Sequence, residues 1–375
     1  MQPTLARCLG RLTIWSLAKI LVTRASAADG GVRHSHLTVK HSCTDNHVIM
    51  KQFVTRPGNQ AEDKEEILAL LLRYRKVAGI HVYPTVWRFR LLLSSRVWKP
   101  TQDTQLWQDA HGHVIAFAML WSRHSTSHYL VLEQFIDPAK ASMRLLDEIL
   151  MWSIQRTKAI GNESQKTLML YTNQLVSKIC SDNQLERHGF SLVKPDLQEH
   201  NLYFSRKLQN SNPPFPALPK DYTVRSLENA NEIDAYQGLY EFAAVNPEHR
   251  KEMFSSDEYG HQVIADLTGR FVAYCEYSIC RAEWQQGIER IGWIDYIGTR
   301  SENRQKGLGH AVLLASLHRL HDMGAEIAML VTVNTNYPAI KLYAKTGFTQ
   351  IAVLEPSRYE MKVRPTINMP NIGSS

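Results

Sequence analysis

The stretch Thr299–Leu317, TRSENRQKGLGHAVLLASL, decides the fold of the second half of the chain. Its centre, Arg304-Gln305-Lys306-Gly307-Leu308-Gly309, sets cations and glycines directly before a run with helical spacing of apolar residues. The preceding residues IDYIGT have the composition of a strand, so the chain must turn sharply and begin a helix. Free amides of a first helical turn bind anions, and glycines let the backbone approach oxygen atoms. The stretch predicts a phosphate-binding loop, although a tight turn without a ligand would show the same pattern.

Two familiar phosphate loops are excluded by the glycine spacing. A Walker loop has a longer spacing that ends in Gly-Lys-Ser/Thr, and the dinucleotide fingerprint has three glycines within six residues. Here only Gly307 and Gly309 stand at the turn. The cations Arg304 and Lys306 suit a pyrophosphate, which favours a polyanionic cofactor.

The composition limits the classes of protein. The 375 residues suffice for two domains, and 44% hydrophobic with 21% charged residues is typical of a globular protein. The net charge is +7, but no long basic block is present, so we expect no nucleic-acid partner. Five scattered cysteines without a CxxC pair indicate a reduced, cytoplasmic compartment and no structural zinc.

Residues 1–49 imitate a secretory signal, with a basic start, an apolar stretch and small residues. Lys19 interrupts the apolar stretch, which is too short to span a bilayer. We therefore predict a disordered or dispensable extension and no membrane partner. We also predict no metal site, although one could be formed by the polar group His34, His36, His41 and Cys43.

Residues 209–220, QNSNPPFPALPK, contain four prolines and read as a linker between two domains. The predicted domains are residues 50–208 and 221–365, with a tail at 366–375. Each half follows the order hairpin, strand, helix, strand, short helix and final strands. Gly189-Phe190 and Gly347-Phe348 occupy the same place in the two halves. This order predicts an α/β fold with a mixed sheet in each half, produced by internal duplication.

The second half carries two motifs in the expected order. The first is R-x-x-G-x-G at Arg304–Gly309, and the second is N-x-x-A-x-x-L-Y-x-x-x-G-F at Asn336–Phe348. Together they resemble the signatures of the GCN5-related N-acetyltransferase (GNAT) superfamily. The resemblance implies two tandem GNAT-like acyl-CoA N-acyltransferase domains. Acetyl-CoA would be the co-substrate.

The resemblance also implies roles for individual residues. The backbone of Ile297 and Thr299 would pair with the pantetheine arm, and Asn336 would contact the cofactor near the second helix. Tyr343 would be the general acid that protonates the departing sulfur, or a packing aromatic. Asp295 would be the base, a relay to it or a substrate contact, since Trp293 cannot take a proton. The pyrophosphate would be held by amides of Arg304, Gln305, Lys306, Gly307, Leu308, Gly309 and His310.

The first half lacks these features. At the place of the loop it reads Pro138-Ala139-Lys140-Ala141-Ser142-Met143-Arg144, without either glycine. Four residues before Gly189 stands Leu185 in place of a tyrosine. We therefore predict that the first half is a degenerate copy, which supports the fold or forms a wall of the acceptor site.

The predicted function is transfer of an acetyl group to a primary amine of a small molecule or peptide, by direct attack in a ternary complex. We expect a monomer or homodimer. The layout is similar to tandem enzymes of the mycothiol synthase type, although Trp293 and Val331 stand where that type is expected to carry Glu and Tyr. The alternatives are a non-catalytic acyl-CoA sensor and a phosphate-binding module for nucleotides.

Overall fold

The computed structural model describes residues 53–79, 85–93, 100–122, 127–173, 182–193, 200–208, 217–237, 239, 254, 256–354 and 358–366. The predicted extension with its His/Cys group, most of the linker and most of the tail lie outside these ranges. Within them no helix has the length and hydropathy needed to cross a membrane.

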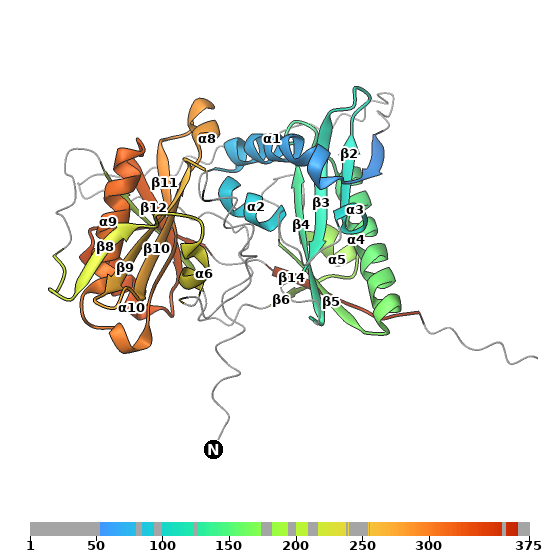
Figure 1. Ribbon diagram of the computed structural model, residues 1–375. Helices are drawn as coiled ribbons and strands as arrows, with labels where there is room; N and C mark the ends of the chain where they lie inside the picture. Colours follow the sequence, from blue (N-terminus) through green and yellow to red (C-terminus); the bar gives the residue numbers. More distant parts are fainter. Residues whose placement is uncertain are drawn as a thin grey trace, which may run out of the picture.

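Two seven-stranded mixed sheets form the molecule, one in each lobe of Figure 1. The strands of sheet A run in the order β1 (Val54–Pro57), β2 (Thr104–Gln108), β3 (Val114–Trp121), β4 (Tyr129–Ile136), β5 (Leu168–Asn173), β14 (Arg358–Val363) and β6 (Ser191–Val193). Those of sheet B run in the order β13 (Thr349–Leu354), β7 (Asn201–Lys207), β12 (Ile327–Val333), β11 (Ile291–Thr299), β10 (Phe271–Ile279), β9 (Tyr259–Asp266) and β8 (Tyr222–Ser226). The predicted α/β class with a mixed sheet in each half is confirmed.

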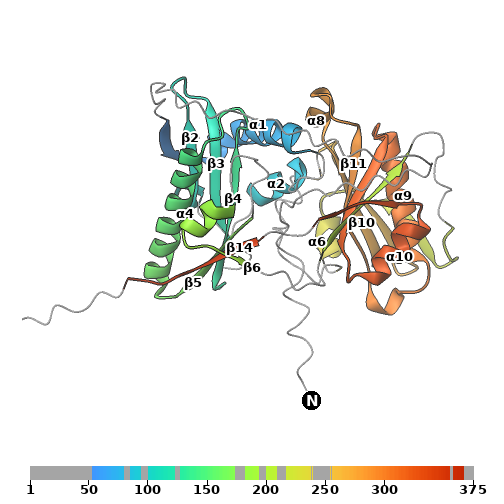
Figure 2. The same cartoon turned by 180° about the vertical axis from the view of Figure 1, so that it is seen from behind.

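Helices cover both sheets. On the outer face of sheet A lie α4 (Met143–Ser164) and α5 (Asp182–Arg187), and on the outer face of sheet B lie α9 (Leu308–Asp322) and α10 (Tyr337–Lys345) (Figure 2). The inner faces are covered by α1 (Gln60–Ala78) and α2 (Val86–Leu93) in the first half and by α6 (Glu232–Gln237) in the second. The described ranges also contain the short elements α3 (Pro100–Asp103), α8 (Arg281–Gln285) and the 3₁₀ turn η1 (Ser301–Asn303).

The two sheets exchange one strand each. Strand β7 precedes the proline-rich segment, yet it lies between β12 and β13 of sheet B. Strand β14 follows that segment, yet it lies between β5 and β6 of sheet A. The predicted division into residues 50–208 and 221–365 therefore does not describe the two sheets. The reason is that antiparallel pairing depends on which strand edge is open, and each open edge is filled from the other half.

Each sheet contains a single parallel pair among the described strands, and both pairs part early. In sheet B the pairing of β11 with β12 covers only Ile291–Trp293, after which β11 continues to Thr299 beside β10 alone. In sheet A the pairing of β4 with β5 covers Tyr129–Leu132. The register of β11 on β10 jumps from Ile294↔Tyr277 to Tyr296↔Glu276, so Asp295 is the extra residue of a β-bulge.

The halves contact each other through the first-half helices. The Arg75 guanidinium of α1 donates to the Glu283 carboxylate of α8, and both side chains are buried. On α2 the Trp87 ring lies 4.8 Å from the Tyr259 ring, centroid to centroid. Arg90 Nη1 donates to Glu258 Oε2 at 3.3 Å. Helix α2 of the first half therefore covers part of the inner face of sheet B.

Glu133 of β4 occupies the place that Asp295 has in β11, four residues after the first parallel pair. Burial raises the pKa of Glu133 from 4.5 to about 8, and the Trp121 indole opposes the shift. The folded protein thus keeps a proton that the unfolded chain releases between these two pH values. The contribution of this group to the free energy of unfolding is complete below about pH 4.5 and is lost as the pH rises to about 8.

We expect the variant Glu133→Gln to lose this dependence, so that it gains up to a few kcal/mol over the wild type between pH 5 and 8.5. Urea midpoints at both pH values measure the effect. The exposed carboxylate Glu163, changed to Gln, is the control and should leave the wild-type dependence in place. A pH dependence that persists in Glu133→Gln would show that Glu133 is ionised in the folded protein.

Candidate active site

The outer half of β11 presents a free edge toward β12. The Arg300 amide donates to the Val272 carbonyl, which fixes residue 300, and by alternation residue 298, as the ones bonded to β10. Ile297 and Thr299 therefore direct their backbone N–H and C=O groups to the opposite edge, where β12 has parted from the sheet. An extended ligand chain can pair with this edge as a further strand would.

The loop after β11 places helix amides beside that edge. Gln305 and Gly307 both have left-handed backbone conformations, with φ of 64° and 80°, and Gly307 is the N-cap of α9. The first helical bond runs from the Ala311 amide to the Gly307 carbonyl, so the amides of residues 308–310 have no acceptor within the helix. With the dipole of a 15-residue helix behind them, these amides form an anion site.

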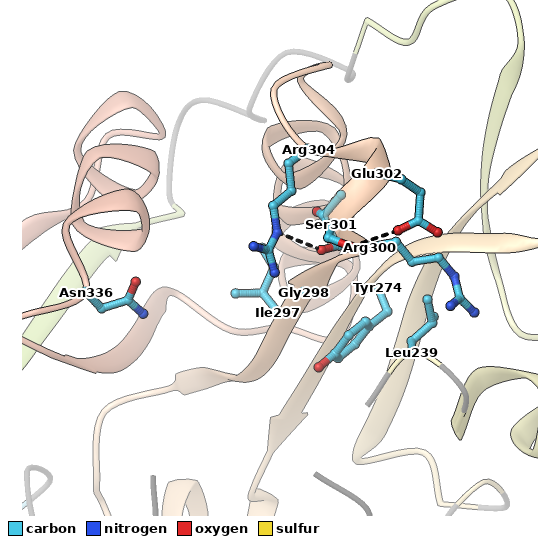
Figure 3. A pocket seen from close by; sticks show the side chains of 10 residues that line it. Leu239, Tyr274, Ile297, Gly298, Arg300, Ser301, Glu302, Arg304 and Asn336 are labelled. Atoms are coloured by element: carbon cyan, nitrogen blue, oxygen red, sulfur yellow. Dashed lines mark hydrogen bonds between the residues drawn. The ribbon is translucent and has the colours of Figure 1, made fainter. Parts of the chain in front are cut away.

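A cavity of about 370 Å³ opens at this point (Figure 3). Four of the predicted site residues line it: Ile297, Thr299, Arg304 and Asn336. Figure 3 shows the lining side chains grouped around the end of β11, with Asn336 on one side and Leu239 on the other. Arg304 Nε donates to the Thr299 carbonyl oxygen at 3.2 Å, which holds the guanidinium over the strand end.

The other predicted loop residues differ in what they offer a ligand. Lys306 is exposed, and its Nζ donates to the Tyr222 hydroxyl at 3.1 Å. The Leu308 side chain is buried in the core under sheet B, so only its amide can face a ligand. His310 is half-buried, and burial together with Lys345 and Arg206 lowers its pKa, so its ring is neutral at pH 7. The groups that this loop offers to an anion are therefore backbone amides and the side chains of Arg304 and Lys306.

Asn336 already has two structural contacts. Its Oδ1 accepts from the Ala339 amide at 3.4 Å, which caps α10, and its Nδ2 donates to Thr332 Oγ1 at 3.2 Å. These bonds tie the start of α10 to the end of β12. Asn336 therefore fixes one wall of the cavity, and its contact with a cofactor stays a prediction.

Tyr343 of α10 lies on the outer side of sheet B. Its ring packs against Phe204 at 5.8 Å and Phe348 at 6.1 Å between centroids. Burial, with a smaller effect from Cys275, raises its pKa far above the usual value of 10. The hydroxyl is therefore protonated at all physiological pH values, as a proton donor must be. The packing role that the sequence left open is also present.

Asp295 lies on the inner side of the sheet, where the bulge turns its side chain away from α9. Ser278 Oγ of β10 donates to Asp295 Oδ2 at 2.6 Å. The bulge at Asp295 stands two residues past Trp293, which is the last residue of β11 that pairs with β12. Asp295 thus stands at the inner end of the free edge of β11, away from the residues that line the cavity.

Amino-acid comparisons place this site in a known family. Residues 225–348 match the model of the acetyltransferase (GNAT) family. The chain is 28% identical over 155 residues to a mycothiol acetyltransferase of Thermomonospora curvata, which is 40% of this chain and 52% of that protein. It is 29% identical over 154 residues to the mycothiol acetyltransferase of Pseudarthrobacter chlorophenolicus, which is 36% of this chain and 45% of that protein. The chain spans about half the length of the curated relatives it matches.

Solved structures share the fold over most of the chain. A tandem GNAT protein from the clavulanic acid biosynthesis pathway has a TM-score of 0.57 at 15% identity, covering 84% of this chain and 100% of that one. A GCN5-related N-acetyltransferase from Sphaerobacter thermophilus has a TM-score of 0.54 at 16% identity, covering 84% and 98%. Residues 225–348 thus match the GNAT family, and the whole chain has a fold similar to that of a tandem GNAT protein. The family resemblance stated from the two motifs is confirmed.

Several residues that line the cavity carried no sequence signal. Gly298 is an exception, because a glycine inside a strand often marks a close approach. A Cβ at Gly298 would lie 2.4 Å from the Tyr274 ring, so this ring lies over the strand where a side chain would otherwise stand. The remaining residues that the sequence did not single out are Leu239, Tyr274, Arg300, Ser301 and Glu302.

The equivalent loop of the first GNAT-like half is occupied by its own side chains. Ser142 caps α4, and its Oγ accepts from the Leu145 amide at 3.3 Å. Asp137 Oδ1 accepts from the Ala139 amide at 3.0 Å, which puts a carboxylate where an anionic ligand would bind. Leu185, which replaces tyrosine, is buried in the core. Ser142 thus takes up one of the first-turn amides of its helix, whereas Gly307 of the second half has no side chain that could do so.

Proposed function

We propose that the second half of the chain binds acetyl-CoA and transfers its acetyl group to a primary amine. The observation that supports this most strongly is the free edge of β11 beside the N-terminus of α9. A thioester arm that pairs with the edge would leave its pyrophosphate at the helix amides. The names of the curated relatives, all acetyltransferases, support the same reaction.

The residues present fit coenzyme A. Backbone groups of Ile297 and Thr299 would bond the pantetheine amides, and the amides of residues 308–310 would hold the pyrophosphate. Arg304 and Lys306 add positive charge at the surface of the loop. The cofactor supplies an activated acyl group, and the protein orients it with its carbonyl near Asp295.

The transfer needs two proton movements. The amine nitrogen attacks the thioester carbonyl, a C–N bond forms and the C–S bond breaks. Asp295 takes the proton from the amine, directly or through water, and Tyr343 gives a proton to the departing thiolate. Burial raises the pKa of Cys275 to about 12 and that of Cys280 to about 11. Neither of these two cysteines, which are the ones in the described part of the chain, is therefore a thiolate that could carry the acetyl group, and the proposed transfer is a direct attack in a ternary complex.

Calorimetric titration with acetyl-CoA, followed by release of free thiol in the presence of an amine panel, tests the proposal. We expect binding to acetyl-CoA and thiol release that depends on the amine. Binding of ATP in preference to CoA would instead identify a nucleotide module.

The variant Tyr343→Phe separates the acid role from packing. It keeps the ring between Phe204 and Phe348 and removes only the hydroxyl. We expect kcat to fall roughly 100-fold, which is in the range of general acid catalysis, with an unchanged Kd for acetyl-CoA and an unchanged Tm. Thiol release with saturating amine measures the effect.

The matched control is Tyr337→Phe, because Tyr337 lies on the same helix and is 68% exposed. This variant should keep wild-type activity. A Tyr343→Phe protein with full kcat would leave only the packing role for this residue.

A second candidate function is a non-catalytic acyl-CoA sensor. The observation that favours it is Trp293, which stands on the central strand in place of a residue that could accept a proton. A sensor would bind acetyl-CoA and release no thiol with any amine. The same titration and thiol assay therefore distinguish the two functions.

A further inference from the structure

The inner face of sheet B carries polar side chains around Asp295. In a bulge the extra residue, its neighbour and the residue opposite project to the same side, so Asp295 and Tyr296 share a side with Glu276. Two cross-strand rows result. One row is His261, Glu276 and Tyr296, and the other is Tyr259, Ser278 and Trp293.

Two carboxylates of this face are held by hydroxyl groups. Glu276 is 1% exposed, and its Oε2 accepts from the Tyr259 hydroxyl. Asp295 accepts from Ser278, as described above. Such donation stabilises the charged form of a carboxylate. The face therefore brings two carboxyl groups, each with a hydroxyl donor, beside the point where β11 and β12 part.

A second observation comes from two tryptophans that flank the carboxylates. Trp293 is 7% exposed and lies opposite Ser278, while Trp87 of the first half is 5% exposed and stacks on Tyr259. Within the described part of the chain, neither indole Nε1–H has a hydrogen-bond acceptor. A buried N–H group without an acceptor is costly, so such donors point to a ligand that supplies oxygen atoms.

We propose that this face binds the acceptor, and that the acceptor is an amino alcohol whose ammonium group lies between Glu276 and Asp295. Its oxygen atoms accept from the Trp293 and Trp87 indoles. Glu276 is a specificity-determining residue, and the first half contributes a wall through Trp87. The two indoles lie at opposite ends of the row Tyr259, Ser278 and Trp293, which crosses two strand spacings of about 4.8 Å each. This inference rests on the proposed function, because it assigns the second substrate of the same site.

The test compares trans-2-aminocyclohexanol with cyclohexylamine, which differ by one hydroxyl. For Glu276→Gln we expect KM for both amines to rise roughly 10- to 100-fold, with kcat and the Kd for acetyl-CoA unchanged. The control is the exposed carboxylate Glu289, changed to Gln, which should leave KM as it is. An unchanged KM in Glu276→Gln, in a protein whose wild type is active, would overturn the inference and leave the proposed function standing.

The oxygen contacts are tested by Trp293→Phe and Trp87→Phe, which keep an aromatic ring and remove the donor. Because this probe has one hydroxyl, one of the two variants should reduce the wild-type preference for the amino alcohol by roughly three- to tenfold, and it identifies the indole that donates to that hydroxyl. Equal preference in the wild type would refute this part of the proposal. If the wild type releases no thiol, calorimetric binding of the amino alcohol to the CoA-saturated protein decides the matter. Absence of binding, or equal binding by Glu276→Gln, then overturns the site.

Discussion

Residues 1–208 and 217–375, produced as two separate proteins, are each expected to fail to fold. The second piece lacks β7, which is an interior strand of sheet B, and the first lacks β14, which lies inside sheet A. Leu202, Tyr203 and Phe204 of β7 are all buried. At about 1.5–3 kcal/mol for each large apolar side chain, their loss alone is comparable with the 5–15 kcal/mol that stabilises a typical domain. Circular dichroism and thermal melting of each piece measure the effect.

Co-expression of the two pieces should restore a folded complex, because each supplies the strand that the other lacks. A second experiment keeps the chain whole and inserts a protease site between residues 209 and 216. After cleavage the fragments should co-elute in gel filtration and separate only in denaturant. A cooperative melt of the isolated piece 217–375 would contradict the strand exchange and support the division at the proline-rich segment.

The exchange shows where local sequence patterns stop being informative. Hairpins such as β9–β10 were predictable, because the turn residues stand between two strand-like runs that must meet. The strands HNLYFSRKL and RYEMKV were also recognised, each at the end of its own half. Their partners were not, since both alternate in the same way and either can fill a gap between two antiparallel neighbours. Pairing across more than 100 residues leaves no mark in the residues themselves.

The same limit applies to the site. The loop residues Arg304–Gly309 were predictable because strand end, loop and helix start are contiguous in the chain. Ile297 and Asn336 followed from the family resemblance. Glu276 and Trp87 were not found, because they reach the face of Asp295 only through strand pairing and through packing of the first-half helix α2. A bulge that turns Asp295 inward has no signature in IGWIDYIGT.

In the variant Gly307→Glu we expect the affinity for acetyl-CoA to fall at least 100-fold while the fold is retained. Gly307 has φ of 80°, and a Cβ added there would meet no atom within 4 Å. The substitution therefore adds no clash, but left-handed backbone costs a non-glycine residue about 1–2 kcal/mol. The carboxylate also lies at the helix N-terminus, where it competes with the pyrophosphate for the same amides, at a further cost of about 1–2 kcal/mol. Calorimetry with acetyl-CoA measures the loss.

Two controls separate charge from backbone strain. Gly307→Asn keeps a residue that tolerates the left-handed conformation and adds no charge, so its affinity should fall only about tenfold. Gly112→Glu introduces the same charge at φ of 81° with open space, but in the β2–β3 hairpin of the first half, and should bind acetyl-CoA like the wild type. If Gly307→Glu binds as tightly as Gly112→Glu, the amides of α9 do not hold the pyrophosphate. The free edge of β11 would then have to account for the whole affinity for acetyl-CoA. The variant Tyr343→Phe does not test this edge, because it is expected to keep the wild-type Kd for acetyl-CoA.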